Sequence, residues 1–129
     1  MPQAAAVEVM VVDDQRAMRA LVRDSLGQIG CPCVSECGDG HEAIQSLRAR
    51  PVNLVVSDLN MPVMDGLALL KAVRSEPILA NTAFIMLTSR GDAEFVKQAI
   101  ALGVNNYLVK PFTLSMLKRK IESVFGPLT

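Results

Sequence analysis

The sequence of 129 residues is half hydrophobic and carries 13 basic and 13 acidic side chains. This length and composition predict one compact domain over residues 1–129, with a sizeable core and no second, output domain. The balanced charge argues against nucleic acid or an anionic membrane surface as a partner. No apolar run approaches the ~20 residues of a membrane span and no signal peptide is recognisable, so we expect a cytoplasmic protein.

The first part of the chain alternates apolar runs with segments of helical spacing. Residues 7–12 are almost entirely apolar and predict a buried strand, and the spacing of apolar residues over 18–29 predicts a helix ended by Gly30. Residues 33–36 give a weaker second strand, and residues 43–47 give a short second helix. This part therefore predicts two pairs of strand and helix.

The rest of the chain continues the alternation with three more pairs. The expected strands are 54–56, 84–87 and 107–109. A helix follows each of these strands. The first of the three opens at Gly66, the second is marked by apolar residues over 95–100, and the third is capped by Thr113. Strict alternation predicts a doubly wound α/β fold, in which five helices flank both faces of a five-stranded parallel sheet.

Polar side chains directly follow four of the five expected strands. Ligands of such folds bind outside the carboxyl ends of the strands, so we expect these side chains to converge on one rim. They are Asp13, Asp14, Asp58, Asn60, Thr88, Ser89 and Lys110. Three carboxylates brought together repel one another and require a cation, and oxygen donors without His or Cys favour Mg²⁺.

The same residues favour phosphoryl transfer to an Asp side chain. A carboxylate acts as a nucleophile toward phosphorus once its surroundings neutralise the negative charge. Mg²⁺ and the Lys110 ammonium would stabilise the transferred oxygens, and the Thr88 hydroxyl would donate a hydrogen bond to one of them.

The motifs resemble the receiver domains of response regulators in two-component signalling, over almost the whole chain. The resemblance rests on the following residues: Asp13-Asp14, the segment DLNMPVMDG from Asp58 to Gly66, Thr88, and Lys110-Pro111-Phe112. Within this family the chain is most similar to the stand-alone, CheY-like chemotaxis regulators. The resemblance implies a flavodoxin-like three-layer sandwich with strand order 2-1-3-4-5.

By this resemblance, Asp58 accepts a phosphoryl group from the phosphohistidine of a histidine kinase. Asp14, Asp58 and the backbone carbonyl of Asn60 are implied ligands of Mg²⁺, with Asp13 assisting through water. Lys110 is implied to contact the phosphoryl group. We expect a switch with intrinsic self-phosphorylation and slow self-hydrolysis, not an enzyme that turns over substrate.

Thr88 and Tyr107 resemble the switch pair of the family, in which the Thr moves toward the phosphate and the aromatic ring turns inward. The added charge then shifts the population toward an active state, and output leaves through the surface of helix 4, strand 5 and helix 5. In chemotaxis the output partner is the flagellar motor switch protein, and a phosphatase is a further expected partner. The alternative is a phosphate shuttle, a phosphate sink or an interaction switch of another pathway.

Two other functions of similar folds fit the sequence less well. A flavin-binding module needs backbone donors for phosphate after the first strand, where Asp13 and Asp14 would repel it. A hydrolytic phosphatase needs a second acid or base beside its nucleophile, and the residue two places after Asp58 is Asn60.

Several positions depart from the best-known chemotaxis members of the family. Leu59 replaces a usual Trp and Arg90 a usual Glu, which we expect to alter the rates of phosphorylation and dephosphorylation. Asp92-Ala93 replaces a usual pair of lysines, which bears on binding to the motor.

The remaining reactive side chains favour structural roles. Cys31, Cys33 and Cys37 match no common zinc or thioredoxin spacing and are expected to be free thiols. His41 is expected on the surface of a helix, and the basic run Lys118 to Lys120 is expected to face solvent, with an acidic partner as the alternative.

Overall fold

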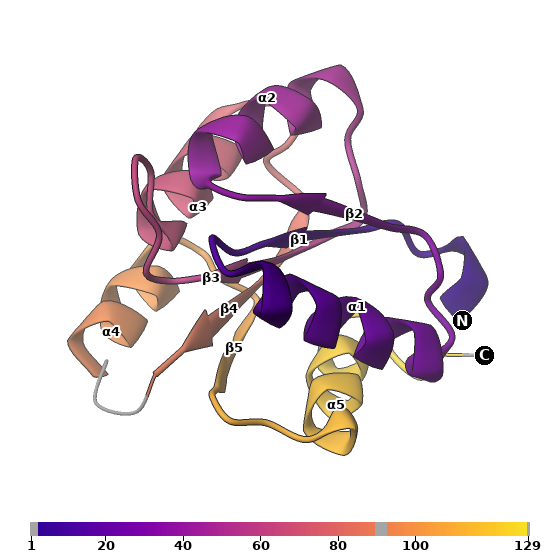
Figure 1. The fold of residues 1–129 in the computed structure, drawn as a ribbon. Coiled ribbons are helices and arrows are strands. Elements are labelled where there is room, and N and C mark those ends of the chain that lie inside the picture. Colours follow the sequence, from indigo (N-terminus) through magenta and orange to yellow (C-terminus); the bar gives the residue numbers. More distant parts are fainter. Residues whose placement is uncertain (1–2, 90–92, 129) are drawn as a thin grey trace.

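The computed structural model describes residues 3–89 and 93–128. Within these ranges the chain forms a five-stranded parallel sheet between two layers of helices (Figure 1). The strands are β1 (Val9–Val12), β2 (Val34–Cys37), β3 (Leu54–Asp58), β4 (Ala83–Thr88) and β5 (Asn106–Val109). Their order in the sheet is β2-β1-β3-β4-β5, which confirms the predicted fold class and strand order.

One helix follows each strand, as the alternation predicts. The helices are α1 (Arg16–Ile29), α2 (Gly40–Ala49), α3 (Gly66–Ser75), α4 (Ala93–Ala101) and α5 (Leu114–Phe125). Gly30 ends α1 with a φ of 107°, and the Thr113 side chain caps α5 by accepting a hydrogen bond from the Met116 N–H, both as predicted. Asp39 and Asp65 cap α2 and α3 in the same way.

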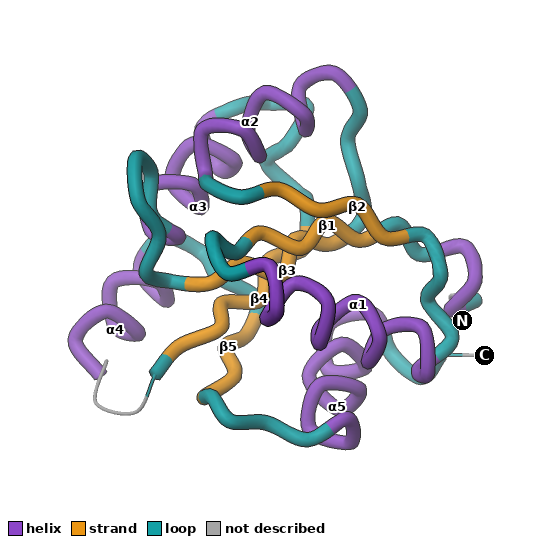
Figure 2. Tube along the Cα trace, in the orientation of Figure 1, coloured by secondary structure: helices purple, strands orange, loops and turns teal. Residues whose placement is uncertain are grey.

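The core consists of two layers because successive strand residues point to opposite faces of the sheet. Val56 of β3 packs in the layer under α1 and α5, whereas its neighbour Val55 packs in the layer under α2, α3 and α4. The helices divide in the same way between the two faces (Figure 2). The sheet is therefore covered on both faces, and the polar side chains that follow its strands lie at the carboxyl ends of the strands.

The structure differs from the sequence prediction at two places. A 3-10 helix, Ala4–Ala6, precedes the sheet, and its last turn is closed by a bond from the Val7 N–H to the Ala4 carbonyl. The first strand therefore begins at Val9 and not at residue 7. In α4, Ala99 is buried, but Phe95 and Ile100 are 43% and 59% exposed, so much of its apolar surface faces away from the core. None of the helices in the described part of the chain is long and apolar enough to cross a membrane.

Candidate acidic site at the carboxyl edge of the sheet

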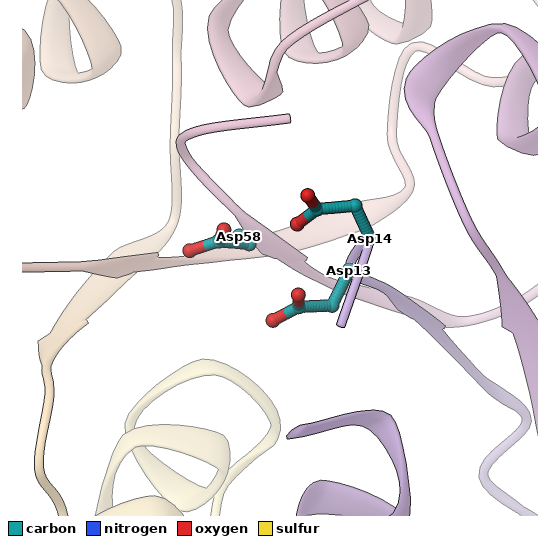
Figure 3. A group of neighbouring side chains, drawn as sticks. All are labelled: Asp13, Asp14 and Asp58. Atoms are coloured by element: carbon teal, nitrogen blue, oxygen red, sulfur yellow. The ribbon is translucent and has the colours of Figure 1, made fainter. Parts of the chain in front are cut away.

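The three predicted carboxylates come together where β1 and β3 end. The two strands are neighbours with Val12 opposite Ser57, so Asp13 and Asp58 emerge side by side. Carboxylate oxygens of Asp13, Asp14 and Asp58 lie within 4.8 Å of one another, and all three groups point to the same side (Figure 3). Asp13 and Asp58 are buried, and Asp14 is exposed, so the cluster reaches solvent at Asp14.

Lys110 supplies a positive charge to this cluster from the end of β5. Its Nζ lies 2.8 Å from Oδ1 of Asp58 and 3.5 Å from Oδ2 of Asp13. A bond of 2.7 Å from the Lys110 N–H to the Thr88 carbonyl holds the backbone at this point, and the peptide bond to Pro111 is cis. The predicted convergence of three strand ends on one rim is thus what the geometry shows.

The electrostatics of Asp58 are unfavourable despite this ion pair. Burial raises the pKa of the Asp58 carboxyl above its ordinary value, the bond and charge of Lys110 oppose the rise, and the Asp13 carboxylate adds to it. One ammonium group therefore faces three clustered carboxylates. The donor set consists of carboxylate oxygens, which fit a hard cation such as Mg²⁺ and do not favour a softer transition metal.

Thr88 follows Leu87, which pairs with Asp58 across the sheet, and its side chain is 2% exposed. Its hydroxyl oxygen is buried and has no hydrogen-bond partner among the residues that the structure describes. A buried hydroxyl without a hydrogen-bond partner lowers the stability of the fold by ~1–3 kcal/mol, so its presence calls for a functional explanation. The Thr88 side chain is thus ready to bond a group that enters this edge.

Tyr107 lies on the same face of the sheet as Thr88. Thr88 pairs with Val109 and Met86 pairs with Tyr107, so Thr88 and Tyr107 are two register positions apart on neighbouring strands and point to one side. The Tyr107 ring is partly buried against the core layer under α3 and α4. The Lys120 ammonium lies 5.4 Å from the centre of the ring.

The segment from Asp58 to Gly66 is closed back onto the sheet. The Leu59 N–H bonds to the Leu87 carbonyl at 3.0 Å, and the Gly66 N–H bonds to the Leu59 carbonyl at 2.9 Å. A β carbon at Gly66 would lie 2.5 Å from the Asp58 carbonyl oxygen, which explains the glycine. Leu59 is buried and Asn60 is exposed, and the role of the Asn60 carbonyl as a ligand stays a prediction.

The side chains of the remaining predicted residues do not join the acidic cluster, or they lie outside the described part of the chain. Cys31, Cys33 and Cys37 are free, as predicted; burial raises the pKa of the Cys31 and Cys37 thiols, whereas Cys33 is exposed. His41 lies exposed on α2, as predicted. Arg90 and Asp92 fall outside the described residues.

Sequence reasoning missed one side chain that reaches this site. Arg19 of α1 donates a hydrogen bond of 2.7 Å to the Asp13 carbonyl. An Arg on the first turns of a helix is common, and nothing in the spacing singles it out. Only the fold brings its guanidinium against the strand end.

A parallel doubly wound sheet with an acidic cluster and a lysine at its carboxyl edge is the arrangement expected of a signalling receiver domain. The chain matches the model of the response regulator receiver domain over residues 9–122, and it belongs to that family. Within that family it is a CheY-like receiver domain.

Known relatives and solved structures agree on this family. The chain is 45% identical over 125 residues to a Rhizobium etli protein named "Probable chemotaxis protein CheY", covering 97% of each chain. It is 40% identical over 121 residues to chemotaxis protein CheY1 of Helicobacter pylori, covering 93% of this chain and 98% of the relative. The structure of chemotaxis protein CheY4 of Vibrio cholerae superposes with a TM-score of 0.84 at 33% identity, over 92% of this chain and 98% of that one.

Proposed function

We propose that Asp58 receives a phosphoryl group from the phosphohistidine of a histidine kinase and that the protein thereby changes its affinity for an output partner. The observation that carries this proposal is the buried Asp58 carboxylate, held 2.8 Å from Lys110 within an acidic cluster. An Asp58 oxygen attacks phosphorus, a P–O bond forms, the P–N bond to the kinase imidazole breaks, and the freed imidazole nitrogen keeps the electron pair.

The residues of the site divide the work of this transfer. Lys110 favours the ionised form of Asp58, which opposes the effect of burial, and offers a charge-assisted bond to a phosphoryl oxygen. Asp14, Asp58 and the Asn60 carbonyl would hold Mg²⁺, and Asp13 would assist. When bound, Mg²⁺ supplies neutralisation of the negative charge on the transferred oxygens. We therefore expect the phosphoryl transfer to depend on Mg²⁺.

The Thr88 hydroxyl would carry the signal away from the phosphate. A phosphoryl group on Asp58 gives this unpaired buried hydroxyl an acceptor, which favours the state in which Thr88 has moved toward it. Tyr107 lies on the same face and would turn into the space that Thr88 leaves. The pair would thus convert a local charge into a change at the surface of β5.

Exposed apolar side chains on α4, β5 and α5 support docking of an output protein at these elements. These side chains are Phe95 at 43%, Ile100 at 59%, Val109 at 37%, Leu114 at 37% and Met116 at 39% exposure. Exposed apolar side chains gathered on neighbouring elements are typical of protein interaction sites. The names of the relatives favour a role in chemotaxis. For that role we propose the flagellar motor switch protein as the partner, and a phosphatase would end the signal. A phosphate shuttle or sink in another pathway is the alternative.

Intact mass after incubation with acetyl phosphate and Mg²⁺ tests the chemistry. We expect one phosphoryl adduct on the wild type, none in the presence of a chelator and none on Asp58→Asn. Asp24→Asn, which removes an exposed acid on α1, is the matched control and should keep the adduct. An adduct that persists on Asp58→Asn would overturn the proposal, as would its absence from folded wild type with Mg²⁺ present.

A second measurement separates chemotaxis from the alternative. Phosphorylated wild type should bind the flagellar motor switch protein more tightly than the unmodified protein. Formation of the adduct without any gain in this affinity would favour the shuttle or sink.

A further inference from the structure

Arg19 connects the acidic site to the edge of the sheet. Its Nη1 donates to the Asp13 carbonyl at 2.7 Å, and its Nε donates to Oε1 of Glu36 on β2 at 3.2 Å. The side chain is 19% exposed, so most of it is held between α1 and the strand ends. A single guanidinium thus contacts both the end of β1 and the neighbouring strand.

The Asp13 carbonyl matters because it belongs to the peptide unit that joins Asp13 to Asp14. This unit is a rigid plane, so fixing its oxygen fixes the direction in which the chain enters Asp14. The rest of Asp13 is held as well, by a bond from its N–H to the Cys37 carbonyl and by one from the Gln15 N–H to its carboxylate. Asp14 is exposed and depends on this plane for its place in the cluster.

The charge of Arg19 by itself would work against a bound cation. Glu36 offsets that charge, because it is paired with Arg19 at 3.2 Å and with Arg23 at 2.6 Å. The hydrogen bond from Arg23 has the largest effect on the pKa of the Glu36 carboxyl and, together with Arg19, lowers it below its ordinary value. Glu36 therefore stays ionised. With its charge balanced, the guanidinium acts on the site chiefly through the direction of its hydrogen bond.

We propose that Arg19 is a positioning residue of the metal site, which holds the Asp13–Asp14 peptide so that the Asp14 carboxylate faces the carboxylates of Asp13 and Asp58. The inference rests on the proposed function, because it requires the site to bind Mg²⁺. It assigns to Glu36 the task of orienting and neutralising Arg19. Residues that orient metal ligands commonly change affinity by ~10–100-fold when they are removed.

The test compares Arg19→Met with Arg23→Met by titrating each protein with MgCl₂ and following backbone amide signals by NMR. Arg23→Met is the matched control, because it removes a second Arg paired with the same Glu36 and leaves the Asp13 carbonyl bond in place. We expect about 10-fold weaker Mg²⁺ binding for Arg19→Met. For Arg23→Met we expect no more than about a twofold change.

Further readouts separate positioning from charge and from general loss of stability. Arg19→Lys, which keeps the charge and one donor, should restore part of the affinity. At saturating Mg²⁺, Arg19→Met should recover most of its rate of phosphorylation by acetyl phosphate. Urea unfolding of all variants in chelator identifies loss of fold, which by itself would not change the Mg²⁺ dissociation constant of the folded protein.

Unchanged or tighter Mg²⁺ binding by Arg19→Met would overturn the inference, since tighter binding is what removal of a mere repulsive charge would give. An equal loss in Arg23→Met would overturn it as well. If the wild type itself neither binds Mg²⁺ nor forms the Asp58 adduct, it is the proposed function that fails.

Discussion

The two ends of the strands differ in how well their polar groups are satisfied. At the amino ends, one side chain, Arg74 of α3, donates hydrogen bonds to four acceptors in two connecting segments. At the carboxyl ends, Asp13 and Asp58 are buried side by side and the Thr88 hydroxyl has no partner among the described residues. The amino ends of the strands therefore contribute to the stability of the fold, whereas the carboxyl ends carry the groups that can react.

The amino edge owes its order to Arg74 and two asparagines. Arg74 donates to the carbonyls of Gly103, Ala80 and Thr82 and to the side chain of Asn105, at 2.6 to 3.0 Å. The Asn105 side chain in turn accepts the Phe84 N–H at 2.8 Å, and the Asn53 side chain accepts the Glu8 N–H at 2.8 Å. The hydrogen bonds of these three side chains thus join the starts of the strands to neighbouring segments.

The carboxyl edge also contains backbone strain. Val63, in the segment after β3, has a φ of 67°, a region that β-branched residues rarely adopt. The Met64 N–H bonds to the Pro62 carbonyl at 2.7 Å, so Val63 is the centre of a three-residue turn. Its side chain is 85% exposed and gains little from packing. Strain of this kind persists near functional sites because the surrounding structure enforces it.

We expect the largest change in the free energy of unfolding when the Arg74 contacts are removed. Arg74→Met keeps much of the side-chain volume but leaves partly buried carbonyls without a donor, so the free energy of unfolding should fall by about 3 kcal/mol. Urea unfolding followed by circular dichroism measures the change.

Arg48→Met is the matched control for this prediction, because Arg48 forms an exposed ion pair with Glu76 and contacts no strand start. Its stability should stay close to that of the wild type, since exposed pairs contribute little. Equal losses in the two variants would mean that the Arg74 contacts do not stabilise the amino edge.

A smaller effect of opposite sign is expected at the carboxyl edge. Val63→Gly should raise the free energy of unfolding by about 1 kcal/mol, because glycine adopts a positive φ without strain and this gain exceeds the entropy that it adds to the unfolded chain. The same unfolding assay applies.

Ile78→Gly is the control for Val63→Gly. Ile78 is 82% exposed but lacks a positive φ, so glycine there should only lower stability. If both variants lose stability, Val63 is not strained in solution.

The sequence predicts the elements and the convergence of the strand ends because both depend on local periodicity and on the rules of parallel sheets. Asp13, Asp58 and Lys110 meet as predicted, since each directly follows a strand. The contacts of Arg19 and Arg74 were not predictable, because each reaches carbonyl oxygens that every residue possesses. The exposure of Phe95 also escaped prediction, because periodicity marks an apolar helix face without saying what covers it.

The smallest effect we expect is on the pH dependence of stability, because Lys110 offsets part of the unfavourable burial of Asp58. Burial raises the Asp58 pKa in the folded protein above its ordinary value of 3.8, so the folded protein binds this proton more readily than the unfolded chain. The contribution of Asp58 to stability is therefore full below that ordinary value and falls as the pH rises through the raised folded pKa.

Asp58→Asn removes the titrating group and should be more stable than the wild type at neutral pH in the presence of a chelator, by a margin that shrinks as the pH is lowered toward 3.8. Urea unfolding of both proteins across this pH range measures the margin. Asp24→Asn, which removes an exposed acid, should show no such trend. If Asp58→Asn is instead the less stable protein at neutral pH, the bond to Lys110 outweighs the burial of the carboxylate, and the carboxyl edge is not electrostatically strained at this residue.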